Sequence, residues 1–122
     1  MEIKIMASGT VVLTGELKKF IEEKLAKLTA LVNPRDTAAM IDVEVGTATG
    51  GQRSGNIFRA EINLQFAGTM VRAEAVGATL HGAIDEAVTE ARRELRKTKD
   101  KRRDLMRRGA TQVKEFFRGF RK

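Results

Sequence analysis

The sequence predicts an α+β fold: a βαβββα two-layer sandwich in which a four-stranded mixed sheet carries two helices on one face. Three observations lead to this prediction. Apolar residues recur with the three-and-four spacing of an amphipathic helix in two stretches, residues 14–28 and 79–108. Four other stretches alternate apolar and polar residues, as half-buried strands do. Two amphipathic helices and a sheet with one apolar face bury their apolar surfaces by packing as two layers.

The first strand is expected at Glu2–Met6, where apolar residues alternate with charged ones. Thr14 offers a hydroxyl cap to the first helix, which is expected to run to about Leu28 and to be ended by Asn33 and Pro34. A strand–helix–strand order predicts that the first two strands lie parallel if they are neighbours.

The second strand is expected at residues 39–45 and the third at residues 57–66. The glycine-rich segment between them, residues 46–55, has no following helix and lacks the Lys-Ser/Thr ending of a phosphate-binding loop. We interpret it as a flexible hairpin loop. The polar side chains opposite the core on these strands are expected to stay in contact with solvent.

A tight two-residue turn is predicted at Ala67-Gly68, because glycine readily adopts a positive φ. The turn leads into a fourth strand at residues 69–75. If Phe66 faces Thr69, small or apolar residues lie opposite one another along the whole hairpin. This agreement supports the assignment of both strands.

The second helix carries most of the positive charge. Gly77 is expected to end the preceding strand and Thr79 to cap the helix. Ten basic residues fall within the seventeen positions from Arg92 to Arg108. A few cations in the last turn complement the helix dipole, at roughly 0.3–1 kcal/mol each, so the dipole does not explain ten. Salt bridges from Glu90 and Glu94 to Arg93 and Lys97 are expected to account for part of the run.

The positive charge is local rather than general. Residues 92–122 contribute 14 − 4 = +10, whereas residues 1–91 contribute 9 − 12 = −3, for the net charge of +7. A cationic end on a slightly acidic body is typical of a nucleic-acid-binding protein, and less often of one that binds acidic lipid or an acidic partner.

Several classes of chemistry are not expected. The chain has no cysteine and one histidine, His81, so a typical metal site or a thiol nucleophile is ruled out. Asp42 and Glu44 lie on the exposed face of a strand, where nothing apolar would raise a pKa. No apolar run is long enough to span a membrane. We expect a cytosolic protein that is not an enzyme and uses no cofactor, metal or small-molecule substrate.

Four segments in this order resemble the ribosome hibernation-promoting factors, the family of ribosome-associated inhibitor A. They are VVLTGELKKFIEEKLAKL at 11–28, FAGTMVRAEA at 66–75, TLHGAIDEAV at 79–88 and RELRKTKDKRR at 93–103. The resemblance covers about residues 1–105. It implies a factor of stationary phase and stress that binds the small ribosomal subunit and its 16S ribosomal RNA in the channel for messenger and transfer RNA, and so preserves idle ribosomes.

The resemblance and the basic run together give the candidate RNA-binding residues. Family positions fall on the last helix and, more weakly, on the first, and the basic run adds three arginines; the full set is Arg93, Arg96, Lys97, Lys99, Lys101, Arg102, Arg103, Lys24 and Lys27. The chain departs from the family at Met6–Ser8, where other members are often basic, and at His81, where others have an aromatic residue.

Residues 106–122 are expected to form a basic tail after this domain. Gly109 is expected to break the long helix and Thr111 to cap a short one, in which Val113–Phe120 has apolar residues at helical spacing. Three modes of contact compete for the tail: docking on the body, contact with a partner, and binding to a membrane surface. We rank docking or a partner contact above the membrane, and no membrane partner is expected. The dimerisation domain of long-form factors is not expected. Two other functions remain open: a general RNA-binding module, because the fold resembles the double-stranded RNA-binding domain in outline, and a protein-interaction regulator such as a sigma-factor modulator.

Overall fold

The structure is a computed structural model that describes residues 1–48 and 57–120, with side chains described as far as residue 107. Its elements follow the predicted βαβββα order: β1 (Glu2–Ala7), α1 (Gly15–Thr29), β2 (Met40–Thr47), β3 (Phe58–Phe66), β4 (Thr69–Gly77) and α2 (Leu80–Phe120). Most of the glycine-rich segment interpreted as a hairpin loop lies outside the described residues.

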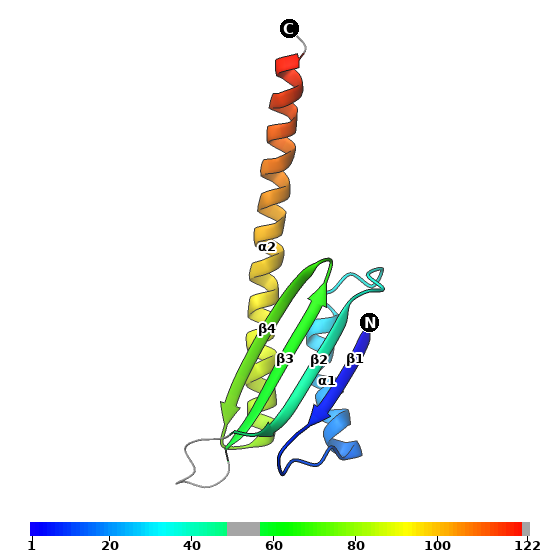
Figure 1. Ribbon diagram of the computed structural model, residues 1–122, viewed down its shortest axis with the longest axis vertical. Helices are drawn as coiled ribbons and strands as arrows, with labels where there is room; N and C mark the ends of the chain where they lie inside the picture. The colour runs from blue at the N-terminus through cyan, green and yellow to red at the C-terminus, as the bar shows by residue number, and fades with distance from the viewer. Residues whose placement is uncertain (49–56, 121–122) are drawn as a thin grey trace.

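The four strands form one mixed sheet in the order β1-β2-β3-β4. β1 and β2 are parallel, and the other neighbours are antiparallel. Both helices lie on the same face of the sheet (Figure 1). The predicted fold class and the parallel first pair are therefore confirmed.

The β3–β4 hairpin has the predicted register, with Phe66 opposite Thr69 and Ala60 opposite Ala75. Ala67 and Gly68 both adopt positive φ, of 46° and 77°. Two successive residues of positive φ give the turn type whose twist matches that of paired strands. The turn therefore fixes the register, as predicted.

The core lies between the sheet and the two helices. One face of each strand and one stripe of each helix supply its buried residues, among them Ile21 and Leu25 of α1, Ile62 of β3 and Ile84 of α2. Among the side chains described for α2, Leu95 is the last that is buried, and all those from Lys101 to Arg107 are exposed. α2 therefore leaves the core after Leu95.

α1 begins where predicted, because the Thr14 hydroxyl accepts a hydrogen bond of 3.1 Å from the Leu17 amide. It ends at Thr29, within one residue of the predicted end. The amide of Ala30 still reaches the carbonyl of Ala26, but the next amides make tighter three-residue turns. Pro34 restricts only the residue before it, so it does not decide where the helix ends.

β4 ends at Gly77, as predicted, but Gly77 itself belongs to the strand and pairs with Phe58, so the predicted last strand residue, Ala75, is wrong. The role of Gly77 is close packing, because a Cβ atom there would lie 3.2 Å from the Ala83 amide nitrogen. Thr79 caps α2 as predicted, and its hydroxyl accepts a hydrogen bond of 3.0 Å from Gly82.

The prediction that Gly109 breaks the second helix is also wrong. α2 runs without interruption from Leu80 to Phe120, so no separate helix begins at Thr111 (Figure 1). A glycine inside a helix costs about 1 kcal/mol relative to alanine, which helix-forming neighbours offset. The side chains of Val113–Phe120 lie outside the described residues, and the predicted modes of contact for the tail stay predictions.

The open face of the sheet is less exposed to solvent than predicted, because Glu61 on this face is buried, with 8% exposure. One Glu61 oxygen pairs with Arg59, and the other lies 3.0 Å from Arg72 and 3.1 Å from the Asn63 amide nitrogen. Arg59 also pairs with Glu74 at 2.8 Å. A buried carboxylate is stable here because both of its oxygens have charged or polar partners.

Among the described residues, no helix is long and apolar enough to cross a membrane.

Candidate nucleic-acid interface

The predicted RNA-binding residues of α2 begin beside the sheet and extend past it. This placement follows from the sequence, because apolar residues at helical spacing stop at Leu95 while basic residues continue. Every side chain from Lys101 to Arg107 is exposed. The basic run therefore projects from the body on a helical support (Figure 1).

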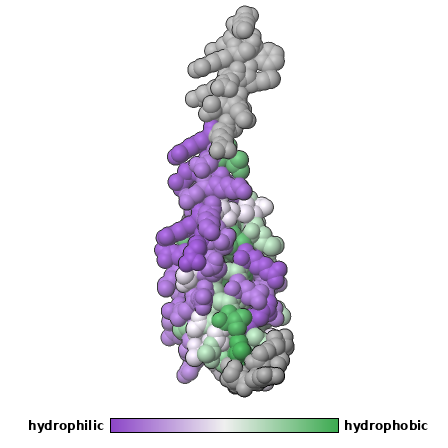
Figure 2. Space-filling view, turned by 90° about the vertical axis from the view of Figure 1, so that its left-hand side faces the viewer, coloured by the Kyte–Doolittle hydropathy of each residue, from purple (hydrophilic) through white to green (hydrophobic). Residues whose placement is uncertain are grey.

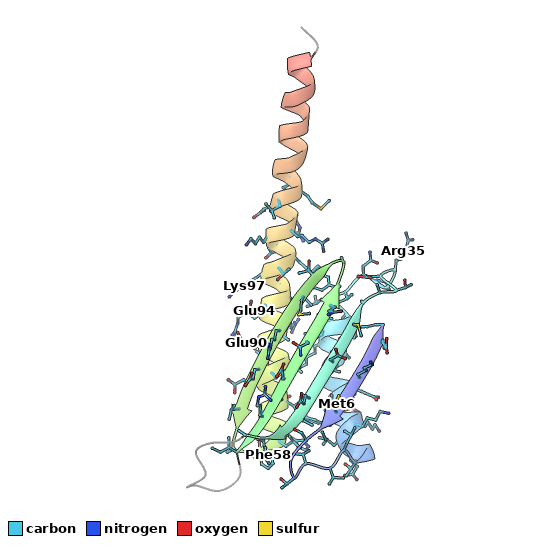
Figure 3. The ribbon with its side chains drawn as sticks, in the orientation of Figure 1. Met6, Arg35, Phe58, Glu90, Glu94 and Lys97 are labelled. Carbon is cyan, nitrogen blue, oxygen red and sulfur yellow. The ribbon has the colours of Figure 1, made fainter. Side chains whose placement is uncertain are left out.

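Two of these cations are held by acidic neighbours on the same helix. Arg93 pairs with Glu90 at 2.6 Å, and Lys97 pairs with Glu94 at 3.5 Å, as predicted. Glu90, Glu94 and Lys97 lie in a row along one side of α2 (Figure 3). Exposed pairs of this kind contribute little to stability and exchange readily with another partner.

Four of the predicted cations on α2 have neither an ion pair nor a side-chain hydrogen bond within the part of the chain whose side chains are described: Arg96, Lys101, Arg102 and Arg103. All four are exposed. We call these four residues the open cations. They repel one another in the free protein, and a polyanion relieves that repulsion.

Lys99 differs from its neighbours because its ammonium group is used inside the fold. The group donates a hydrogen bond of 2.7 Å to the Leu31 carbonyl, just after the end of α1. Orphan carbonyls at a helix end need such donors. Lys99 therefore ties α1 to the point where α2 leaves the body.

The first-helix candidates lie along the contact between α1 and α2. Lys24 pairs with Asp85 at 2.9 Å, and its ammonium group lies 5.4 Å from the centre of the Phe20 ring. Lys27 is one turn further along α1 and is exposed. The charge of Lys24 is thus partly neutralised within the fold, whereas no described ion pair uses Lys27.

The single histidine also belongs to this contact. The His81 ring stacks on Phe20, with ring centres 4.2 Å apart and an angle of 30° between the planes. The packing or surface role that the sequence suggested for it is confirmed. The two helices run in the same direction, because their contacts rise in residue number along both. The contacts are Phe20 with His81, Lys24 with Asp85 and Leu31 with Lys99.

Sequence reasoning missed Arg92 as an individual residue. It is half-buried, and its Nε atom is shielded from solvent without a hydrogen-bond partner in the described structure. Arg92 stands seven residues after Asp85, so it shares the side of α2 that faces α1. That spacing from His81 and Asp85 is the signal that could have identified it.

The open face of the sheet has the opposite character. The register places three basic and five acidic side chains there, a sum of 3 − 5 = −2, and they are Lys4, Arg59, Arg72, Glu2, Asp42, Glu44, Glu61 and Glu74. The hydrogen bond from Arg59 holds the pKa of the Glu74 carboxyl below its usual range, and the same bond raises the pKa of Arg59. Both sheet arginines are therefore engaged, and the face repels polyanions.

The charge distribution thus gives one surface suited to an anionic polymer. Figure 2 shows hydrophilic residues along the described part of α2, with apolar residues gathered to one side. A phosphate group binds favourably to cations that have no partner within the protein, because each cation–phosphate contact releases counterions from the nucleic acid. No set of His, Cys, Asp or Glu side chains in the described residues is arranged to hold a metal ion.

Comparisons with known proteins give the family and the fold of the chain. Residues 5–103 match the family described as "Sigma 54 modulation protein / S30EA ribosomal protein". The chain is 30% identical over 99 residues to a ribosome hibernation promotion factor of Deinococcus radiodurans, and the match covers 81% of this chain and 50% of the relative. The chain thus spans about half the length of the curated relative it matches.

Two solved structures share the fold. The N-terminal domain of Thermus thermophilus protein Y is 26% identical, with a TM-score of 0.65 over 80% of this chain and 99% of that one. A ribosomal subunit interface protein from Coxiella burnetii is 17% identical, with a TM-score of 0.64 over 82% of this chain and 99% of that one. Because the family match extends from β1 into the basic part of α2, the chain belongs to the sigma 54 modulation protein / S30EA ribosomal protein family.

Proposed function

We propose that this protein is a ribosome-associated hibernation factor of the cytoplasm. It binds the small ribosomal subunit in the channel for messenger and transfer RNA, and it preserves idle ribosomes without catalysing a reaction. Family membership and the name of the Deinococcus relative support association with the ribosome. The placement of the site on α2 rests on the charge distribution of this chain.

The observation that carries the proposal is the group of open cations. They stand on a helix that has already left the core, so they can approach an RNA groove or channel without moving the fold. Each phosphate that they neutralise strengthens binding and makes it more dependent on salt. Arg93 and Lys97 join them by exchanging a weak glutamate pair for a phosphate.

The other candidates have smaller roles in this proposal. Lys99 and Lys24 already serve the fold, so their contribution is mainly the positive field that they add. Lys27 and the half-buried Arg92 extend the cationic surface along the contact between the two helices. The acidic open face of the sheet is turned away from the ribosomal RNA.

Sedimentation with purified ribosomal subunits tests this function. The wild-type protein should travel with the small subunit in low-salt sucrose gradients, and the Arg96→Glu/Lys101→Glu variant should remain at the top. The matched control is Lys18→Glu/Lys19→Glu, which changes the net charge equally on exposed positions of α1 and should sediment like the wild type.

Other outcomes would contradict the proposal in distinct ways. If the wild type stays at the top of the gradient, ribosome association is wrong. If it binds unrelated double-stranded RNA as tightly as the small subunit, the protein is a general RNA-binding module. If the α1 control loses binding as completely as the α2 variant, the site is not on the end of α2.

A further inference from the structure

A pocket of about 390 Å³ lies where the end of α1, the β3–β4 turn and α2 meet. Leu31, Val32, Phe66 and Met106 supply its apolar lining. The pocket lies beside the open cations, because Arg102 also lines it. Its volume falls in the range of pockets that hold small organic groups.

Hydrogen bonds hold the walls of this pocket in place. Lys99, itself a lining residue, ties the carbonyl of Leu31 to α2 at 2.7 Å. The Asp36 carboxylate accepts a hydrogen bond of 2.8 Å from the Ala67 amide and so joins the loop after α1 to the β3–β4 turn. A site whose walls are already ordered binds a ligand at a lower entropic cost.

The rim of the pocket is cationic and the interior is apolar. Arg102 and Arg103 have no ion-pair partner in the described structure, and Lys99 adds a third positive charge. The side-chain oxygen of Asn33 accepts a hydrogen bond of 2.9 Å from the backbone amide of Arg35, which leaves the side-chain NH₂ group of Asn33 to donate to a ligand. A ligand that satisfies this arrangement needs an anionic group, an apolar body and a hydrogen-bond acceptor.

We infer that this pocket binds one unstacked nucleotide of a single-stranded RNA segment. The base lies against Met106, above the small part of the buried Phe66 that lines the pocket, and the adjacent phosphate lies between Arg102 and Arg103. Sequence-tolerant binding of single strands combines a cationic track with apolar or aromatic platforms for bases in this way. The inference rests on the proposed function and names the form of RNA that this end of α2 takes.

Charge spacing favours RNA over an acidic peptide. The pocket opens onto a helix with ten cations in seventeen positions, and RNA carries one phosphate at every nucleotide. An RNA strand that places one base in the pocket can therefore continue along the remaining cations of α2. A peptide would need a comparable run of acidic residues next to its apolar anchor.

Two ribose-phosphate oligomers of six residues provide the test, one with a single adenine and one with none. Both have the same charge, so the difference in Kd measures the base alone. For the wild-type protein at low salt, the adenine should tighten binding roughly tenfold, within the range found for single bases on protein platforms.

The variant Met106→Glu places a carboxylate at the pocket, and the control Leu105→Glu places one on the adjacent residue, which does not line it. Both residues are exposed, at 74% and 56%, so neither change disturbs the core. Both variants should bind the base-free oligomer equally. The adenine should still tighten binding tenfold in Leu105→Glu and less than twofold in Met106→Glu.

Two results would overturn the inference. The first is that adenine has the same effect in both variants, or no effect in the wild type. The second is that a hexapeptide of five glutamates and one leucine binds more tightly than the adenine oligomer and loses affinity only in Met106→Glu, which makes the pocket a protein-docking site. Cosedimentation of the wild type with the small subunit remains a separate result, so the pocket can fail while the proposed function stands.

Discussion

Arg59 and Arg72 both contact Glu61, but they do so under different conditions. The Arg59 side chain is 32% exposed and contacts two carboxylates, whereas Arg72 is 63% exposed and contacts one. A hydrogen bond to a buried charge contributes more than one at the surface, because water replaces a missing partner less well in a buried position. Arg59 is therefore expected to contribute more to the free energy of unfolding than Arg72, although both are arginines on the same face of the sheet.

Replacing Arg59 by Gln should lower the free energy of unfolding by about 1–3 kcal/mol, because Glu61 loses a charged partner in a buried position. Arg72→Gln should lower it by less than half as much. Urea denaturation of the two variants and the wild type measures both values. Equal losses would contradict the central role of Arg59.

Arg59 also sets a pH dependence through Glu74. The lowered pKa of Glu74 means that its pairing stabilises the native state above the ordinary glutamate pKa of about 4.3, and that this stabilisation is lost as pH falls through the lowered native pKa. An NMR titration of the Glu74 carboxyl should show a midpoint below the ordinary value in the wild type. In Arg59→Gln the midpoint should move up towards that value.

Lys99 and Lys101 are neighbouring lysines on α2 that differ in their contacts with the fold. Lys99→Met should lower the free energy of unfolding by about 1.5 kcal/mol, because the Leu31 carbonyl loses a charged donor. Lys101→Met should leave it unchanged within about 0.5 kcal/mol, because this side chain is exposed and has no partner in the described structure. In RNA binding the order should reverse, with the larger loss for Lys101→Met. Denaturation curves and filter binding of the same preparations check both statements.

At the scale of elements, the β3–β4 turn requires positive φ at two positions, of which one holds glycine, which adopts it readily, and the other holds alanine, which does not. Gly68 has no atom within 4 Å of the position of a Cβ, so Gly68→Ala should lower the free energy of unfolding by about 1 kcal/mol through backbone strain alone. Ala67 also has a positive φ, and asparagine tolerates this conformation better, so Ala67→Asn should raise it by about 0.5–1 kcal/mol. Thermal unfolding should show Tm shifts of opposite sign, and shifts of the same sign would contradict this account.

Elements also show what the sequence can and cannot predict. The order of elements along the chain and the hairpin register are predictable, because hydrophobic periodicity and a two-residue turn are local features. The length of α2 is not, because the penalty for Gly109 is small and depends on the neighbouring helix. The contact between Lys99 and Leu31 spans 68 positions of the chain, so no local pattern contains it. The burial of Glu61 likewise depends on cross-strand partners.

For the whole molecule, the proposed binding of RNA should depend on the separation of an acidic body from a basic helix end. Each cation–phosphate pair that a substitution removes should flatten the slope of log Kd against log salt by roughly 0.7–0.9. Arg96→Glu/Lys101→Glu should therefore flatten it by roughly 1.4–1.8 if both residues touch phosphates. Lys18→Glu/Lys19→Glu should leave the slope unchanged, and titrations over a several-fold range of salt concentration give all three slopes. A parallel change of slope in both variants would point to net charge rather than to a located site.

The long α2 also makes the molecule narrow at its C-terminal end and wide at the sheet. A single helix with its side chains is about 10–12 Å across, whereas the body behind it contains a four-stranded sheet and a second helix. From Arg96 to Phe120 the helix rises roughly 36 Å. The helix can therefore enter a passage too tight for the body, and the sheet then acts as a stop that limits how deep it goes.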